Sequence, residues 1–146
     1  MNGEPITILL VEDNPDHAEL VMRGLESNQV GNRIVHVEDG ESALDYMFQR
    51  GRFADPENSP RPHLVLLDLR LPRVDGLEVL KTLKSNDETK RVPIVILTTS
   101  DAERDVAMAY EHHANSYLVK PVSFVKFMEL TRDLGFYWFA WNKGPE

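Results

Sequence analysis

The segment HLVLLDLRLPRVDG, residues 63–76, places a carboxylate where an apolar strand is expected to end. Its first part, HLVLLD (63–68), is a short and mostly aliphatic run that closes on Asp68. Such a run is typical of a strand that is buried on both faces of a sheet. An ionised carboxylate at its end loses hydration, so it needs a cation or hydrogen-bond donors close by. The groups that the rest of the chain brings to Asp68 therefore decide how its charge is stabilised.

Four other short apolar runs share the character of this strand, and helical patterns separate them. The runs cover residues 6–11, 33–37, 92–98 and 116–119, and the helical patterns cover about 15–27, 41–50, 76–85, 100–113 and 122–142. Apolar strands that alternate with helices predict a parallel sheet covered on both faces. Right-handed crossovers then favour an α/β, doubly wound (βα)5 arrangement. The chain of 146 residues is interpreted as one domain, 1–146.

Short polar residues ahead of the helical patterns predict where the helices begin. The candidate N-caps are Asn14 (followed by Pro15), Asp39, Asp75 and Ser100. In the first helix, Leu20, Val21 and Leu25 fall on one face and are expected to point inward. The stretch GRFADPENSPRP, 51–62, is rich in proline and polar residues and is expected to form a long loop.

Composition excludes several classes of function. The formal net charge of -8 disfavours sequence-independent binding to nucleic acid, because such binding needs a basic surface. The absence of cysteine excludes disulfides, thiolate metal sites and a cysteine nucleophile. No secretory signal and no apolar run near the roughly 20 residues of a membrane span are present. We therefore expect a soluble, cytoplasmic protein.

The chemically informative residues all follow strands. In a doubly wound sheet the site lies beyond the carboxyl ends of the strands. The residues expected there are Glu12, Asp13, Asp68, Thr98 and Lys120. Three neighbouring carboxylates repel one another, and Mg²⁺, which prefers oxygen ligands, would relieve that repulsion. A metal, a lysine and a hydroxyl around one carboxylate resemble a phosphoryl-transfer site in which the carboxylate is the nucleophile.

Each of these residues also has an ordinary structural explanation. The acid pair of Glu12 and Asp13 could be a solvated loop, and Asp68 a strand-end cap. Thr98 could simply pack as a β-branched residue, and Lys120 could begin a common Lys-Pro turn. The position of every one of them after a different strand, at the same edge of the sheet, favours a shared phosphoryl site over four separate coincidences.

Four motifs together resemble the receiver domain of two-component response regulators. They are VED (11–13), LLDLRLPRVDG (66–76), ILTTS (96–100) and YLVKP (117–121), and the resemblance spans about residues 6–130. It implies a flavodoxin-like fold with strand order 2-1-3-4-5. It also implies that Asp68 accepts a phosphoryl group from a phosphohistidine on a sensor histidine kinase. The implied cofactor is Mg²⁺, with ligands from Asp13, Asp68, the backbone carbonyl of Arg70 and, through water, Glu12.

The resemblance also implies a switch. Thr98 would move to hydrogen-bond the phosphoryl group, and Tyr117 would turn inward as Thr98 moves. Lys120 would pair with the phosphoryl group, and a cis bond would precede Pro121. The surface formed by the fourth helix, the fifth strand and the fifth helix would then change its affinity for a partner.

The long loop 51–62 narrows the resemblance. Similar loops occur in the small response regulators that partner bacterial and cyanobacterial phytochromes, which implies a phytochrome-type kinase and a homodimer. The tail FYWFAW, 136–141, carries more aromatic rings than one helix face can bury, which favours an interface. The predicted interface residues are Phe127, Tyr137, Trp138 and Trp141. The alternative is that the tail folds back over its own domain.

Two other functional classes remain as alternatives. A phosphatase of the haloacid dehalogenase type also uses a strand-end aspartate, but it needs an acid two residues later, where this chain has Arg70. A receiver-like module that only binds a partner is disfavoured by the complete set of acids, hydroxyl and lysine. The five histidines are not expected to form a metal site.

Overall fold

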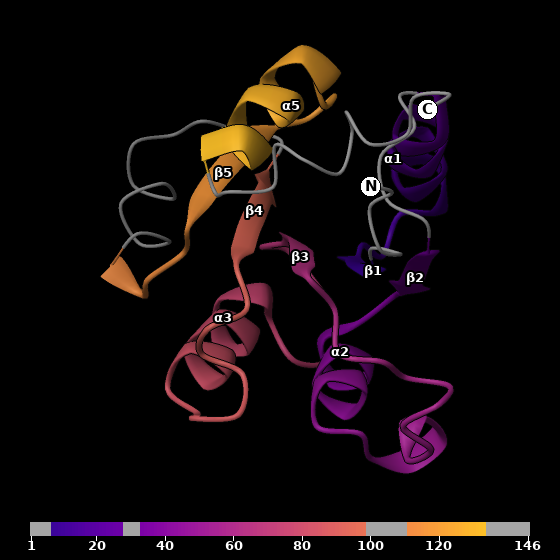
Figure 1. Ribbon diagram of the computed structural model, residues 1–146, viewed down its shortest axis with the longest axis vertical. Helices are drawn as coiled ribbons and strands as arrows, with labels where there is room; N and C mark the ends of the chain where they lie inside the picture. The colour runs from indigo at the N-terminus through magenta and orange to yellow at the C-terminus, as the bar shows by residue number, and fades with distance from the viewer. Residues whose placement is uncertain (1–6, 28–32, 99–110, 134–146) are drawn as a thin grey trace, which may run out of the picture.

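A computed structural model describes residues 7–27, 33–98 and 111–133. Its five-stranded parallel sheet has the order β2-β1-β3-β4-β5, which confirms the predicted flavodoxin-like fold (Figure 1). The elements are β1 (Thr7–Val11), α1 (Pro15–Ser27), β2 (Arg33–Val37), α2 (Gly40–Met47), the 3₁₀ turn η1 (Gly51–Phe53), β3 (Leu64–Asp68), α3 (Gly76–Lys84), β4 (Ile94–Thr98), β5 (Ser116–Val119) and α5 (Phe124–Asp133). Most of the helix expected at 100–113, and the last helix beyond residue 133, lie outside the described residues.

The sheet separates two apolar layers. Alternate residues of β1 point to opposite faces, so Leu9 packs with α2 and α3 whereas Leu10 packs with α1 and α5. The helices accordingly lie on opposite sides of the sheet (Figure 1). Strands β1, β3 and β4 are buried along their whole length. The continuous apolar runs seen in the sequence are therefore explained by burial on both faces.

Strand register brings the predicted site residues level with one another. Val11 pairs with Leu67, so the residues that follow them, Glu12 and Asp68, end neighbouring strands at the same height. Asp68 in turn pairs with Leu97, one residue before Thr98.

The fifth strand completes this edge. Thr98 pairs with Val119, and the backbone amide of Lys120 donates to the carbonyl of Thr98 at 2.7 Å. Parallel pairing therefore places residues from four strand ends at one edge of the sheet.

The loop before β3 is held by its own polar contacts. The Tyr46 hydroxyl donates to the carbonyl of Pro60 at 2.7 Å, and the Ser59 hydroxyl donates to the carbonyl of Phe53 at the same distance. The Gln49 side chain donates to the carbonyl of Ser59. Ser59 is buried, so these bonds satisfy polar groups that have lost their hydration.

The structure confirms two of the predicted helix caps and corrects a third. The Asn14 side chain accepts from the backbone amides of Asp16 and His17, and the Asp39 side chain accepts from that of Ser42 at 2.7 Å. Asp75 occupies the N-cap position of α3, but its side chain makes no capping hydrogen bond. The prediction for Asp75 was right in position and wrong in mechanism.

Two further expectations about helices were wrong. Leu20 was expected to point inward, but it is 60% exposed, because α1 presents Val21 and Leu25 to the sheet. Helix α2 ends at Met47 and not near Arg50, because Gln49 has a positive φ of 54° that a helix cannot accommodate.

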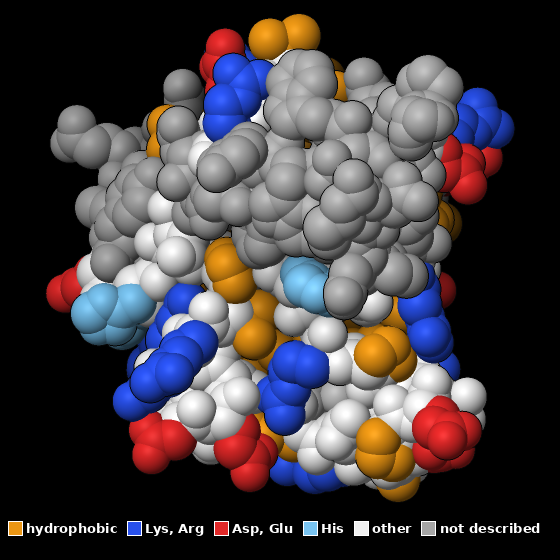
Figure 2. All heavy atoms as spheres, in the orientation of Figure 1, with side chains coloured by type: hydrophobic (Ala, Val, Ile, Leu, Met, Phe, Trp, Pro, Cys, Tyr) orange, Lys and Arg blue, Asp and Glu red, His pale blue; other side chains and the backbone are white. Residues whose placement is uncertain are grey.

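The outer surface over α2 and α3 carries both signs of charge. On the face shown in Figure 2, basic and acidic side chains both lie below the residues drawn in grey, with exposed apolar side chains between them. Within the described ranges, no helix combines the length and the apolar character that a bilayer crossing requires.

The two aspartates at helix N-termini give a direct test of capping. We predict that Asp39→Ala lowers the free energy of unfolding by about 1 kcal/mol, because the amide of Ser42 loses its acceptor. Asp75→Ala serves as the matched control and should cost less than about half of that, since no capping bond is lost. Urea unfolding of both variants measures the difference, and equal losses would contradict the assignment.

Candidate functional site

Three carboxylates meet at the carboxyl edge of the sheet. Glu12 and Asp13 follow β1, Asp68 ends β3, and one oxygen of each lies within 4.8 Å of the others. Glu12 is completely buried and Asp68 is 5% exposed, whereas Asp13 is exposed. The cluster is therefore open to solvent on the side of Asp13 and enclosed on the side of Glu12.

Hydrogen bonds hold both the backbone and the side chain of Glu12. Its backbone amide donates to the carbonyl of Val37 at 3.0 Å, and its own carbonyl lies 2.8 Å from Nε2 of His36, which donates to it. Its carboxylate accepts from the amide of Asn14 at 3.2 Å. Since the carboxylate is also buried, the interpretation of Glu12 as part of a solvated loop is wrong.

Lys120 supplies the positive charge that the buried carboxylates require. Its Nζ donates to Oε1 of Glu12 at 2.6 Å and to Oδ2 of Asp68 at 3.1 Å. The side chain of Lys120 is only 7% exposed, so both ion pairs are shielded from water. The charge of Asp68 is stabilised by this lysine, which the sequence analysis expected at the same edge of the sheet.

A third acceptor of the lysine is His17. Nζ of Lys120 lies 3.1 Å from Nδ1 of His17, in the first turn of α1. Sequence reasoning considered the histidines only as metal ligands and missed this residue. No pattern in the sequence indicated this contact, because Lys120 lies 103 residues away along the chain.

The backbone around Asp68 leaves little space. Oδ1 of Asp68 accepts from the backbone amide of Arg70 at 3.0 Å, which leaves Oδ2 to Lys120. The amide of Gly76 donates to the carbonyl of Leu69 at 3.1 Å. A Cβ at Gly76 would lie 2.2 Å from the carbonyl oxygen of Asp68, so only glycine allows α3 to start this close to β3.

Burial and charge shift two pKa values in this network. Burial raises the pKa of Glu12, and its hydrogen bond with Lys120 opposes that rise. For Lys120, burial alone would lower the pKa, but the hydrogen bond to Glu12 and the negative charge of Asp68 outweigh it and raise the pKa above its usual range. The lysine therefore stays charged while it holds the two acids.

The other predicted switch residues lie where the strand pattern placed them. Thr98 ends β4 and is buried, and Tyr117 in β5 is partly buried against the core layer that contains α2 and α3. The peptide bond between Lys120 and Pro121 is cis, as expected. The movements of Thr98 and Tyr117 and the metal contact of the Arg70 carbonyl stay predictions.

One predicted interface residue is wrong. Phe127 is completely buried in the core layer between the sheet, α1 and α5, so its side chain cannot face a second molecule. The period of the helix points it toward its own sheet. Tyr137, Trp138 and Trp141 lie outside the described residues.

The donor set fits a hard divalent cation. All three clustered side chains offer carboxylate oxygens, which are the ligands that Mg²⁺ prefers. A cation that keeps several waters needs only one or two direct carboxylates and an open side, and the exposed Asp13 provides that side.

Replacing Lys120 should show how strongly the buried acids destabilise the fold when they have no counterion. In metal-free buffer we predict that Lys120→Met lowers the free energy of unfolding at about pH 7.5 by about 3 kcal/mol, since Glu12 and Asp68 lose their counterion.

The pH dependence of this loss has a defined sign. A carboxyl whose folded-state pKa is raised contributes stability that is present at low pH and is lost as pH rises through that pKa. Without Lys120 the pKa of Glu12 should rise further, so the loss should shrink as pH falls toward about 5. Denaturant titrations at both pH values measure the difference in free energy of unfolding between wild type and Lys120→Met. A difference that stays constant or grows as the pH falls would contradict the account.

Comparisons with known proteins agree with this geometry. A family model described as "Response regulator receiver domain" matches residues 8–132. The probable methanogenesis regulatory protein FilR2 of Methanothrix harundinacea is 44% identical over 142 residues, which are 97% of this chain and 89% of FilR2. Response regulator Rcp1 of Synechocystis sp. is 40% identical over 137 residues, which are 94% of this chain and 91% of Rcp1.

Solved structures extend the comparison. The bacteriophytochrome response regulator AtBRR has a TM-score of 0.82 at 46% identity, over 93% of this chain and 96% of that chain. The Mn²⁺-bound form of Rcp1 has a TM-score of 0.75 at 40% identity, over 92% and 95%. The chain therefore belongs to the response regulator receiver domains, a family of phosphoacceptor signalling proteins and not of catalytic enzymes, and it closely resembles the phytochrome response regulators.

Proposed function

We propose that Asp68 is the phosphorylation site of this receiver and that a sensor histidine kinase in the cytoplasm is its phosphodonor. The observation that carries the proposal is the contact between Oδ2 of Asp68 and the buried ammonium of Lys120 at 3.1 Å. In this step Oδ2 attacks phosphorus, the bond from phosphorus to the donor imidazole breaks, and its electron pair stays on the imidazole nitrogen. Lys120 then lies beside the oxygens of the transferred group, where its charge stabilises them.

Mg²⁺ is the proposed cofactor, and it would supply further positive charge next to the phosphoryl oxygens. The residues proposed to hold it are Asp13 and Asp68 directly, the carbonyl of Arg70, and Glu12 through water. The clustered carboxylates support this assignment, as does the Mn²⁺-bound form of Rcp1, which shows that a similar receiver accepts a divalent cation.

The proposed response uses the strand end next to Asp68. Thr98, one residue beyond the partner of Asp68 in β4, would turn its hydroxyl toward the phosphoryl group, and Tyr117 would fill the space that Thr98 leaves. The backbone bond from Lys120 to Thr98 joins β5 directly to this movement. The surface of β5 and α5, with the helix that the sequence predicts before β5, would then present a changed face to a partner.

The phosphatase alternative has little support from the site. The residue two positions after Asp68 is Arg70, whose backbone amide donates to Oδ1 of Asp68 and whose side chain cannot act as an acid in a phosphatase cycle. The module that only binds would not need a lysine buried against its aspartate, since such a charge cluster costs desolvation energy.

A phytochrome-type kinase is the proposed partner. Support comes from the similarity of this chain to a bacteriophytochrome response regulator and from the loop between α2 and β3. FilR2, a probable regulator of methanogenesis, is similar as well, so a kinase of another sensory class is the competing donor.

A homodimer formed through α5 and β5 is also proposed. Val125 on α5 is 72% exposed and Val119 on β5 is 38% exposed, and a hollow of about 620 Å³ lies between these two elements. Strand β5 is an edge of the sheet, which favours association through this side. Tyr137, Trp138 and Trp141, which follow α5 in the sequence, would extend the interface.

Phosphorylation of Asp68 can be measured directly. With Mg²⁺ and a small phosphodonor such as phosphoramidate, we predict that the wild type gains the mass of one phosphoryl group, in a base-labile form. Asp68→Asn should gain none, because an amide is not a nucleophile toward phosphorus. Asp16→Asn, an exposed aspartate of the same region, is the matched control and should behave as wild type.

The same assay tests the donor and the proposal as a whole. An autophosphorylated phytochrome-type kinase should transfer its phosphoryl group faster than an unrelated sensor kinase, and the reverse order would remove the phytochrome assignment. Equal incorporation into wild type and Asp68→Asn would place the phosphorylation site elsewhere.

Dimerisation has its own measurement. We predict that the mass of the wild type in solution at high micromolar concentration corresponds to two chains and that Val125→Glu shifts it toward one, because a charge would be buried in the interface. Leu20→Glu, at an exposed apolar position on α1, is the control and should leave the mass unchanged. A monomeric wild type, both with and without beryllofluoride, would contradict the proposal.

A further inference from the structure

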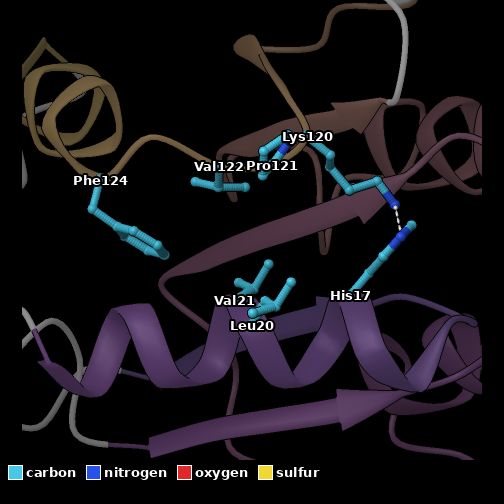
Figure 3. Close-up of a pocket in the computed structure, with 7 residues that line it drawn as sticks. All are labelled: His17, Leu20, Val21, Lys120, Pro121, Val122 and Phe124. Carbon is cyan, nitrogen blue, oxygen red and sulfur yellow. Dashed lines mark hydrogen bonds between the residues drawn. The ribbon is translucent and has the colours of Figure 1, made fainter.

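His17 contacts Lys120, which in turn contacts the proposed phosphoacceptor Asp68. Figure 3 shows its imidazole rising from α1 toward the end of the Lys120 side chain, with the dashed line marking the contact of 3.1 Å. We infer that His17 is a positioning residue for Lys120, which holds the ammonium so that one N–H faces the reacting oxygen of Asp68. This inference rests on the proposed phosphoacceptor function and adds a residue to its site.

The number of hydrogens on the ammonium gives His17 this role. An ammonium has three N–H groups and no acceptor. Within the described residues, three acceptors lie around Lys120: Oε1 of Glu12 at 2.6 Å, Nδ1 of His17 at 3.1 Å and Oδ2 of Asp68 at 3.1 Å. Because the three N–H directions are tetrahedral, two fixed acceptors determine where the third hydrogen points. Glu12 and His17 together therefore aim the remaining N–H at Asp68.

The contact also fixes the tautomer of the histidine. Since Lys120 can only donate, Nδ1 of His17 must carry a free lone pair, and the neutral ring then bears its proton on Nε2. The backbone supports this arrangement, because the amide of His17 donates to the side chain of Asn14 in the N-cap of α1. The imidazole is thus held in the first turn of the helix, next to the end of β1.

The other surroundings of the lysine give it little alternative. His17 and Lys120 line one end of a cavity of about 320 Å³, and the other residues that line it are apolar, namely Leu20, Val21, Pro121, Val122 and Phe124 (Figure 3). On this side of the ammonium, His17 is therefore the side-chain acceptor that the lining provides. Lysine has a flexible stem, so the loss of one acceptor would let its head turn toward water in the cavity.

The arrangement can persist through the reaction. When a phosphoryl group bonds to Oδ2 of Asp68, the N–H that faced this oxygen can pass to an oxygen of the attached group. The bonds to Glu12 and His17 need not change. His17 would therefore keep the lysine aimed both before and after transfer, without contacting the phosphoryl group itself.

The test compares the rate of phosphorylation by phosphoramidate with Mg²⁺, which avoids any effect on kinase docking. His17→Ala should react roughly three- to tenfold more slowly than wild type, because the ammonium loses one hydrogen bond that orients it. His17→Asn should recover most of the rate, since its Oδ1 takes the place of Nδ1. Leu20→Ala, on the same helix and lining the same cavity, has no such contact and should react as wild type.

Two results would overturn the inference. One is a wild-type rate for His17→Ala, and the other is an equally slow His17→Asn, which would point to a purely steric role. A second readout does not depend on the stability of variants: nitrogen NMR of the wild type should show His17 protonated at Nε2 and unprotonated at Nδ1, and the opposite tautomer would also overturn it. If the wild type itself takes up no phosphate, the phosphoacceptor function fails, which is a distinct outcome.

Discussion

The ammonium of Lys120 lies between two carboxylates that separate strands bring into the interior, and the other features of the site depend on this contact. Glu12 and Asp68 are both buried, and an uncompensated pair of acids there would be strongly unfavourable. Lys120 reaches both, at 2.6 and 3.1 Å, from the loop after β5. The same charge that permits the acids to be buried is then available to a phosphoryl group on Asp68.

The fold provides this contact through parallel pairing and close backbone approach. Register along β1, β3 and β4 sets Glu12 and Asp68 at one height and Thr98 one residue further along, and apolar layers pack on both faces of those strands. Gly76 lets α3 begin directly against the carbonyl of Asp68. Asp13, by contrast, stays exposed. The site is therefore enclosed on the side of Glu12 and Asp68 and open on the side of Asp13, where a cation or phosphodonor can approach.

The sequence predicted the features that follow from chain order and failed where three-dimensional packing decided. Strand ends of a parallel sheet must share an edge, so Asp68, Thr98 and Lys120 could be grouped in advance. His17 was missed because its partner is 103 residues away and a lone histidine carries no pattern. Phe127 and Leu20 were misplaced for the converse reason: apolar character predicts burial or contact, but the rotation of each helix decides which.

The central claim, that Lys120 passes one of its hydrogen bonds from Asp68 to the phosphoryl group, is tested most directly by a crystal structure with Mg²⁺ and beryllofluoride, which stands in for the phosphoryl group on Asp68. The account predicts that Nζ of Lys120 contacts a fluorine of the beryllofluoride while it keeps Glu12 and His17 as acceptors. A lysine that turns away from the beryllofluoride, or that leaves Glu12 to reach it, would contradict the account.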